Sequence, residues 1–364
     1  MHEDIERVLE EYYRRDLHYE SGRILGSMYT KPPDIVLNYF FKFYQANLGN
    51  PGLYPGTVAM EREVLRFLLR LTSGEENYPG HVLSGGTEAN ITALWAAREM
   101  GYRRILTTED AHFSILKASN LLSMPVEYVP MRDYVMDVKA LSDIIQDDDV
   151  VVATAGITST GLIDPVEEIG RVCSEHRCFL HVDAAFGGFV IPFLPDRVKF
   201  GFDVPAVQSV TIDPHKMGMA PYPAGGLVAR ENLFEGIAVD APYLMRGKSD
   251  TLLGTRQSGS VAAAYAAILH FGMSGYREVV RECMERTEYL MRILREEGFE
   301  ILTPPRLNIL NIVVKDAEKV KKSLYDIGWA VSTNPRYNSL RIVVMPHVTE
   351  EIIEKFVGDL KKII

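Results

Sequence analysis

Lys216 has the most distinctive chemical setting in the sequence. It follows Asp213-Pro-His at the end of a β-branched run that begins at Ser209. Most lysines of folded proteins are exposed surface charges, which is the default interpretation of this residue taken alone. A lysine amine can also form a Schiff base with the carbonyl group of a cofactor. His215, directly before it, could reach a phosphate of the same ligand.

A glycine turn offers a second candidate site. Ser84-Gly-Gly-Thr-Glu-Ala-Asn90 follows the short apolar run His81-Val-Leu83 and opens an alanine-rich helical pattern. The glycines allow a ligand to approach the backbone closely, and a helix N-terminus presents free N–H groups and a positive dipole end to an anion. Thr87 could add a hydroxyl donor to a phosphate. The alternative is a tight turn in which Thr87 caps the helix.

Two further side chains stand where predicted strands end. Asp183, in His181-Val-Asp-Ala-Ala-Phe-Gly-Gly188, follows a buried apolar run, at the sheet edge where open α/β proteins bind ligands. A buried carboxylate needs a partner such as a protonated pyridine nitrogen, although Asp183 could simply cap the following turn. The two alanines after it leave room for a flat ring. His112 either caps its helix or stacks on such a ring.

These four segments supply complementary chemistry for one ligand. Pyridoxal phosphate (PLP) has an aldehyde for a lysine, a phosphate for a glycine turn and a pyridine ring for an aspartate and a histidine. We therefore predict PLP as the cofactor, because four separate explanations would otherwise have to coincide. The remote alternative is a metal-dependent hydrolase. Its candidate ligands are His181, Asp183, Asp213 and His215.

The elements that position these residues alternate between strand and helix from about residue 80 to 230. This alternation predicts a mostly parallel α/β sheet, and the near-continuous apolar strands fit burial on both faces. We expect Asp137 to cap the third helix and Asp164 to precede a proline at the first position of the fourth. The predicted strands are 105–108, 126–129, 150–154, 178–182, 209–212 and 226–229, and the helices are 87–100, 113–122, 138–146 and 165–175.

The pattern changes after about residue 258. A long helical stretch over 260–297, interrupted at Gly272–Gly275, leads into strands and helices of a small α+β domain that ends in a helix from Thr349. The first 50 residues are helical and rich in aromatic side chains. We therefore predict an N-terminal segment (1–50) that packs on the other parts, a large α/β cofactor-binding domain (51–258) and a small C-terminal domain (259–364).

Composition excludes several classes of protein. The chain has 364 residues, of which 47% are apolar and 24% charged, as in ordinary globular proteins. A net charge of −10 and the absence of a basic run argue against a nucleic-acid partner. No apolar stretch reaches the length of a membrane span, and the acidic N-terminus does not resemble a signal peptide. Three cysteines without a paired pattern predict reduced thiols and a cytoplasmic protein.

Taken together, the motifs resemble the group II PLP-dependent amino-acid decarboxylases, which have the aspartate aminotransferase-like fold type I. The closer resemblance is to the archaeal-type L-tyrosine/L-aspartate decarboxylases, and it spans nearly the whole chain. It rests on the four segments above and on further motifs at 47–53, 211–218, 253–256 and 340–347.

The resemblance implies a role for each motif. Lys216 would carry the cofactor, Asp183 would pair with the pyridinium, and His112 would stack on the ring. The family often has a pair of threonines after the mid-sheet glycine, whereas this chain has Ala155-Gly-Ile-Thr-Ser-Thr160, so that Thr158 and Thr160 are alternative contacts. The remaining cofactor-binding residues implied are Gly86, Thr87 and His215 at the phosphate, and Ala185 on the other face of the ring.

The same resemblance implies decarboxylation of an L-amino acid, L-tyrosine or L-aspartate, at a site at a homodimer interface. Tyr243, in the 240–256 segment, is the candidate general acid, with a packed aromatic as the alternative. Arg341 is the candidate for binding a substrate carboxylate or else pairs with an acid, and Asn47 is a second substrate-binding candidate. L-Glutamate decarboxylation, another fold-type I lyase reaction and an aminotransferase stay open.

Overall fold

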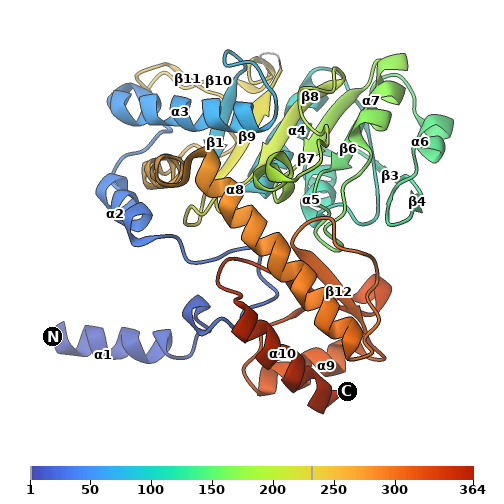
Figure 1. Ribbon diagram of the computed structural model, residues 1–364. Helices are drawn as coiled ribbons and strands as arrows, with labels where there is room; N and C mark the ends of the chain where they lie inside the picture. The colour runs from blue at the N-terminus through green and yellow to red at the C-terminus, as the bar shows by residue number, and fades with distance from the viewer. Residues whose placement is uncertain (1, 231–232) are drawn as a thin grey trace. The chain divides into compact units, whose positions relative to one another are not determined.

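The computed structural model describes residues 2–230 and 233–364, which divide into two compact units (Figure 1). The large unit comprises residues 32–281 and 305–307, and the small unit comprises 1–31, 282–304 and 308–364. The predicted boundary at residue 258 coincides with the start of helix α8 (Ser258–Glu296), whereas the two units divide inside that helix.

A seven-stranded sheet forms the centre of the large unit and confirms the predicted α/β class. Its order is β1-β9-β8-β7-β6-β2-β3, and the four pairs from β8 to β3 are parallel. Strand β9 runs antiparallel to both of its neighbours, β1 and β8. The strands are β1 (Gly80–Leu83), β2 (Arg104–Thr107), β3 (Val126–Tyr128), β6 (Asp149–Thr154), β7 (Phe179–Asp183), β8 (Val207–Ile212) and β9 (Gly225–Ala229).

The direction of β9 was not apparent from the alternating pattern. Because two antiparallel pairings restore the original direction, β1 runs parallel to β8, and its carboxyl end lies at the same edge of the sheet. The amino end of β9 shares this edge, where Gly225 pairs with Leu83. A Cβ on Gly225 would lie 2.4 Å from the Cα of Gly85, so this crowded corner requires a glycine.

Helices connect the strands largely as predicted. Helix α4 buries its alanines Ala89, Ala93, Ala96 and Ala97 in the same core cluster as residues of β1, β2, β6 and β9, since small side chains allow close approach of the helix. The helices that connect or flank the strands of this unit are α2 (Asp34–Phe43), α3 (Pro55–Leu71), α4 (Gly86–Glu99), α5 (Phe113–Leu122), α6 (Val138–Ile144) and α7 (Val166–Glu175). Two short hairpins are formed by β4 (Met131–Arg132) with β5 (Val135–Met136), and by β10 (Val239–Asp240) with β11 (Lys248–Ser249).

The two aspartates at the starts of predicted helices had different outcomes. Asp137 caps α6 as expected, accepting hydrogen bonds from the N–H groups of Lys139 and Ala140. The prediction that Asp164 precedes a proline at the first helical position was wrong by one residue, because Pro165 is the N-cap of α7, and the Asp164 carboxylate is buried. It accepts hydrogen bonds from Met136 N (2.8 Å) and Thr154 N (2.7 Å). Its two oxygens thereby satisfy donors on β5 and β6.

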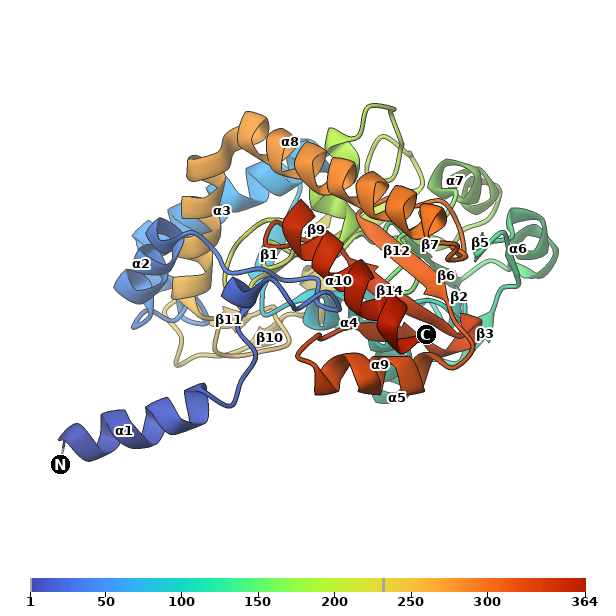
Figure 2. The same ribbon diagram turned by 60° about the horizontal axis from the view of Figure 1, so that its bottom comes forward.

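The small unit is an α+β structure, as the sequence predicted. Its antiparallel sheet has the order β12-β14-β13, with β12 at Ile309–Val313, β13 at Ser332–Asn334 and β14 at Ser339–Val343. Helices α9 (Ala317–Asp326) and α10 (Glu350–Ile363) lie beside each other (Figure 2). Trp329 and Phe356, the latter on α10, are buried in the core of this unit. Thr349 caps α10, and α1 (His2–Tyr13) also belongs to this unit.

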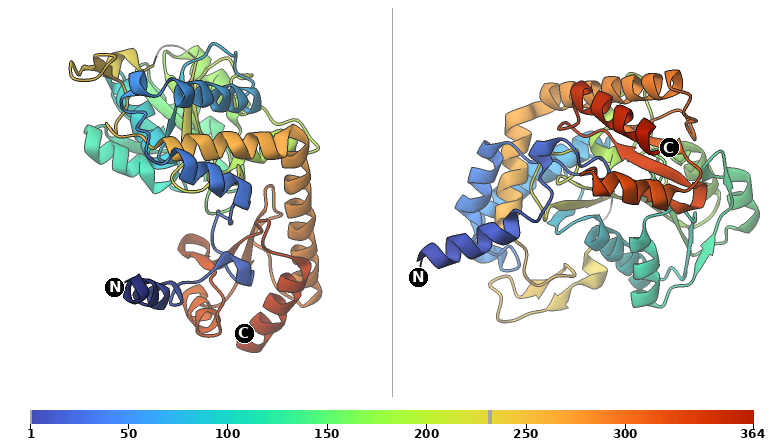
Figure 3. Two further views of the ribbon diagram at one scale, coloured as in Figure 1. Left: turned by 90° about the vertical axis from the view of Figure 1, so that its left-hand side faces the viewer. Right: turned by 90° about the horizontal axis from the view of Figure 1, so that it is seen from below.

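Helix α8 bends at the predicted interruption. Gly272 has φ 55° and ψ −173°, a conformation that favours glycine and interrupts the helix. Figure 3 shows the bend in this helix, drawn in orange. No helix in the described part of the chain is long and apolar enough to cross a membrane.

Candidate active site

A cavity of about 300 Å³ opens at the carboxyl ends of the strands in the large unit. Turns after β1, β6, β7 and β8 contribute to it, in agreement with the general position of ligand sites in open α/β sheets. The residues predicted to bind the cofactor all line it, namely Gly86, Thr87, His112, Thr158, Asp183, Ala185, His215 and Lys216.

Lys216 lies against a second buried acid that the cofactor hypothesis did not include. Its Nζ is 3.2 Å from Oδ2 of Asp213, and the two side chains are 17% and 1% exposed. The other oxygen of Asp213, Oδ1, has no hydrogen-bond partner among the described residues. Such an orphaned buried oxygen is costly, and Asp213 belongs to the lining of the cavity. Only the hydrolase alternative had drawn attention to Asp213.

His215 stands between this acid and the glycine turn. Its Nδ1 donates to the carbonyl of Ala224 at 2.6 Å, and its Nε2 is 3.6 Å from Oδ2 of Asp213. Burial lowers the pKa of the imidazole. A phosphate close to Nε2 would oppose this effect, because a nearby anion favours the protonated ring.

The glycine turn after β1 has the form of an anion cradle. Helix α4 begins at Gly86 with Gly85 as its N-cap, so Thr87 does not cap the helix. A Cβ on Gly86 would lie 2.9 Å from Oδ2 of Asp213, and a Cβ on Gly85 would lie 3.2 Å from Cε1 of His215. Glycines therefore let the turn close on these side chains, while the first N–H groups of α4 lack partners within the helix.

Asp183 and His112 line the cavity, and each also makes the capping contact that was the alternative to a cofactor role. Asp183 is 4% exposed; its Oδ1 accepts from the N–H of Ala185 at 3.1 Å, and its Oδ2 accepts from Nδ2 of Asn90 at 2.7 Å. His112 is the N-cap of α5 and accepts a hydrogen bond from Ser114 N at its Nδ1. Burial lowers the pKa of His112, which favours an uncharged ring that can stack on a flat ligand.

The two threonines of the mid-sheet loop are distinguished by their surroundings. Thr158 lines the cavity. Thr160 is 1% exposed and its hydroxyl accepts a hydrogen bond from Leu162 N at 3.3 Å. Thr158 is therefore the better candidate for a cofactor contact. Phe113 and Phe186 also line the cavity, although the sequence had given no signal for either.

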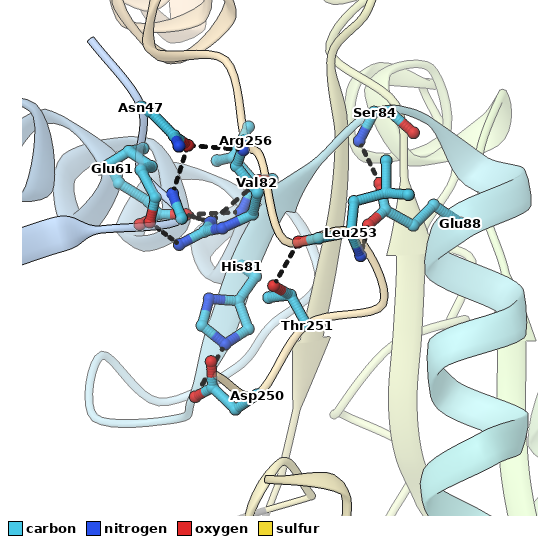
Figure 4. A network of polar contacts seen from close by, with 12 residues as sticks. Asn47, Glu61, His81, Val82, Ser84, Glu88, Asp250, Thr251, Leu253 and Arg256 are labelled. Atoms are coloured by element: carbon cyan, nitrogen blue, oxygen red, sulfur yellow. Dashed lines mark hydrogen bonds and ion pairs between the residues drawn. The ribbon is translucent and has the colours of Figure 1, made fainter. Parts of the chain in front are cut away.

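Tyr243 and Asn47 belong to the large unit but do not line the cavity. Tyr243 is 85% exposed in the connection between β10 and β11. The Oδ1 of Asn47 accepts from Gly49 N at 2.7 Å and Arg256 N at 3.0 Å (Figure 4). Their predicted roles in catalysis and substrate binding stay predictions.

A neighbouring set of contacts reaches the glycine turn through Glu88 (Figure 4). This buried carboxylate accepts from Ser84 N at 2.7 Å and from Leu253 N at 3.3 Å. The turn and the segment after β11 are therefore joined by one side chain.

Arg341, on β14 of the small unit, is a buried cation with no carboxylate partner among residues 2–230 and 233–364. It is 8% exposed, and its Nη1 donates to Oγ of Ser332 at 2.6 Å and to the carbonyl of Gly26 at 3.2 Å. Its Nε has no hydrogen-bond partner among the described residues. Burial lowers the pKa of Arg341 to about 10. The described residues of the small unit therefore do not form the ion pair that was the alternative for Arg341.

The ligand set of the hydrolase alternative is not assembled. His181 is buried and uses its two ring nitrogens in hydrogen bonds with Ser209 Oγ (2.8 Å) and Asn90 Oδ1 (3.0 Å). Within residues 2–230 and 233–364, no group of three or more histidine, cysteine, aspartate or glutamate side chains could hold a metal ion.

The arrangement fits PLP instead. A primary amine, a cradle of glycines and helix N–H groups, and a buried carboxylate surround one cavity, as an aldehyde, a phosphate and a pyridine nitrogen require. The orphaned oxygen of Asp213 is a further sign that the cavity accommodates a polar group.

Comparisons with known proteins point the same way. A probable L-tyrosine/L-aspartate decarboxylase of Methanocella arvoryzae is 43% identical over 100% of this chain and 98% of its own length. A probable L-aspartate decarboxylase of Pyrococcus abyssi is 41% identical over 100% of the chain and 97% of its own length. The structure of a Burkholderia pseudomallei sphingosine-1-phosphate lyase has a TM-score of 0.89 at 24% identity, covering 99% of this chain and 90% of the other, which shows a shared fold.

The conserved domain of the pyridoxal-dependent decarboxylases matches residues 51–315. This range contains each of the residues that line the cavity. The chain therefore belongs to the pyridoxal-dependent decarboxylase family, and its cofactor is PLP.

Proposed function

We propose that this protein is a PLP-dependent carboxy-lyase that decarboxylates L-aspartate, and L-tyrosine as a second substrate. The observation that carries the proposal is the single cavity in which Lys216, Asp183 and the glycine turn meet. The names of two relatives support the choice of substrates, since L-aspartate occurs in both and L-tyrosine in one.

Each group of side chains in the cavity has a proposed role in binding one part of PLP. Bound PLP supplies an electron sink for the electron pair left behind when CO₂ departs. Lys216 would hold the cofactor through Nζ, and Asp183 would hold the proton on the ring nitrogen. His112 and Ala185 would enclose the ring. The phosphate would be held by Gly86, Thr87, His215 and Thr158.

Substrate binding requires a cation that the cavity lining does not offer. Its only basic side chains are Lys216, which the cofactor would engage, and two histidines. Arg341 is a buried guanidinium whose Nε and charge have no hydrogen-bond or carboxylate partner in the described part of the chain, so it is the proposed residue for a substrate carboxylate. Asn47 is the proposed second substrate-binding residue. Tyr243 is proposed to deliver the proton that replaces the lost carboxyl group.

The decisive experiment offers L-aspartate, L-tyrosine and L-glutamate separately to the purified enzyme and measures CO₂ and amine release. We expect turnover of L-aspartate and L-tyrosine; exclusive turnover of L-glutamate, or amino transfer without CO₂, would refute the proposal. Borohydride reduction followed by mass spectrometry should locate the cofactor on Lys216. Lys216→Ala should lose the reducible yellow colour.

We also propose that the active enzyme is a homodimer to which each chain contributes. Large apolar side chains are exposed on the described surface, including Phe41 (66%) and Tyr44 (56%) near α2 and Met245 (67%) beside Tyr243. Such exposure is typical of surfaces that contact another chain. The position of Tyr243 outside the cavity lining fits a tyrosine that serves the site of the partner.

Subunit mixing tests this arrangement. Lys216→Ala and Tyr243→Phe should each be inactive alone. If Tyr243 acts across the interface, hybrid dimers contain one intact site, and an equal mixture that re-equilibrates should recover up to about a quarter of wild-type activity. Absence of recovery in a mixture shown to contain hybrids would contradict the proposal. Sedimentation should give the mass of two chains.

A cytoplasmic location is proposed as well. Cys173, Cys178 and Cys283 are buried free thiols, as expected in a reducing compartment. Cell fractionation with an antibody against the protein tests it, and recovery in a membrane or secreted fraction would contradict it.

A further inference from the structure

Asn90 occupies a central position behind the cavity. It lies in α4, is 1% exposed, and belongs to the lining of the cavity. Its Nδ2 donates one hydrogen bond to Asp183 Oδ2 (2.7 Å) and one to Ser114 Oγ (2.9 Å), while its Oδ1 lies 3.0 Å from Nε2 of His181. One amide thereby connects residues on β7 and α5 with its own helix.

The chemistry of these partners fixes the direction of each hydrogen bond. An ionised carboxylate only accepts, so the amide nitrogen of Asn90 must face Asp183 and its oxygen must face His181. His181 then donates from Nε2, and its Nδ1 accepts from Ser209 Oγ at 2.8 Å. Burial lowers the pKa of His181 to about 4, in agreement with a neutral ring that has one donor and one acceptor.

A second branch leads from Asn90 to the other side of the cavity. Ser114 Oγ accepts from Asn90 and is 2.8 Å from Nδ1 of His112, to which its hydroxyl can donate. His112 Nδ1 also accepts from Ser114 N at 3.3 Å. Both contacts require an unprotonated Nδ1. The ring of His112 is therefore oriented by a residue that itself depends on Asn90.

We propose that Asn90 is a positioning residue that keeps the PLP ring nitrogen protonated by holding the charge and orientation of Asp183, while it orients His112 through Ser114. The proposal rests on the PLP-dependent function proposed above. Its physical basis is that a donor to one carboxylate oxygen stabilises the ionised form. The proton would then stay on the ring nitrogen, whose N–H would donate a hydrogen bond to the ionised Asp183 carboxylate.

The test is the protonation state of the ring nitrogen in the holoenzyme. Wild type, Asn90→Leu and Asn90→Ala are reconstituted with PLP labelled with ¹⁵N in the ring, and the ¹⁵N resonance is recorded at neutral pH. We expect the wild type at the pyridinium position and both variants shifted toward neutral pyridine. PLP dissociation constants, measured by equilibrium dialysis, should rise about 10- to 100-fold, as expected for loss of a hydrogen bond to a charged group.

Two matched variants distinguish positioning from general disruption. Thr92→Val changes another buried polar residue of α4, whose hydroxyl has no partner among the described residues. It should leave the ¹⁵N resonance and PLP affinity unchanged. Ser114→Ala cuts only the branch to His112 and should retain the pyridinium resonance. Steady-state kinetics should show a fall in kcat for Asn90→Leu with KM changed less than about threefold.

The outcomes separate this inference from the proposed function. A folded Asn90 variant with the wild-type ¹⁵N resonance and PLP affinity overturns the positioning role alone. An equal shift of the ¹⁵N resonance in Thr92→Val also overturns the positioning role, because any substitution of a buried residue of α4 would then change the protonation of the ring nitrogen. Failure of the wild type to bind PLP would overturn both this inference and the proposed function.

Discussion

The buried ion pair between Glu61 and Arg256 holds the strand before the glycine turn, and we predict a large loss of stability when it is broken. Their side chains are 9% and 8% exposed (Figure 4). Arg256 Nη1 donates to Glu61 Oε1 and to the carbonyl of Val82 (3.2 Å), and Glu61 Oε1 also accepts from Val82 N (2.9 Å). Val82 belongs to β1, which ends immediately before Ser84. The pair therefore fixes the strand that carries the turn.

Glu61→Gln keeps the shape of the side chain but leaves Arg256 as a buried cation without its counter-charge. Removing one partner of a buried ion pair destabilises a protein by about 3 to 5 kcal/mol. For a unit of this size, 1 kcal/mol corresponds to about 2 to 4 °C in Tm. We therefore expect the Tm to fall by roughly 6 to 20 °C. Circular dichroism at a fixed PLP concentration measures it, since bound ligand also stabilises the fold.

Two controls test the role of burial. Glu63 lies on the same helix and pairs with Arg66, but these side chains are 42% and 52% exposed. Glu63→Gln should change stability by less than about 1 kcal/mol. Combining Glu61→Leu with Arg256→Met removes both charges and should recover most of the stability lost in Glu61→Gln. If the Tm of the Glu61→Gln variant equals that of the Glu63→Gln control, the reasoning is refuted.

Three other outcomes are expected. Asp183→Asn should bind PLP but lower kcat by roughly 100- to 1000-fold in steady-state assays, because a neutral amide cannot stabilise the ring charge; a loss below tenfold would contradict this. Burial lowers the pKa of His181 from 6.5 to about 4. The folded state thus binds fewer protons than the unfolded state between these values, and stability falls with pH below about 6.5, by about 2 kcal/mol at pH 5. Urea denaturation at pH 7 and pH 5 should show this loss in wild type and a smaller one in His181→Gln; equal losses would argue against it. Thr92→Val removes a buried hydroxyl without a partner and should raise the free energy of unfolding by about 1 kcal/mol in urea, whereas destabilisation would show that the hydroxyl is bonded.

The sequence predicts those parts of the site that depend on local pattern. Lys216 and Asp183 both follow apolar runs that had to be strands, and parallel strands bring their carboxyl ends to one edge. The class of the sheet follows from the same alternation. The direction of β9 does not follow from this alternation. The loop between β8 and β9 has no helical pattern, so the sequence does not indicate whether β9 pairs with β8 in the parallel or the antiparallel direction.

Residues that act through long-range contacts were missed as functional groups. Asn90 lies within an alanine-rich helix, and its bond to Asp183 spans 93 positions in the chain. Nothing local indicates which face of the helix meets that carboxylate. The prediction for Asp164 was wrong for a related reason. Aspartate before proline is typical of a helix start, but the carboxylate instead accepts hydrogen bonds from two N–H groups that are distant in the sequence.

The antiparallel return of β9 has a consequence for the lysine. Residues 213–224 connect the carboxyl end of β8 with the amino end of β9, and these two strands are paired, so both ends of the loop are held by the sheet. Hydrogen bonds from His215 N to Ala224 O (3.0 Å) and from Ala220 N to Pro214 O (3.0 Å) hold the loop further. Its conformational entropy is lost when the sheet forms. The amine can thus be pre-organised in the apoenzyme, and cofactor capture need not wait for a disordered loop to fold.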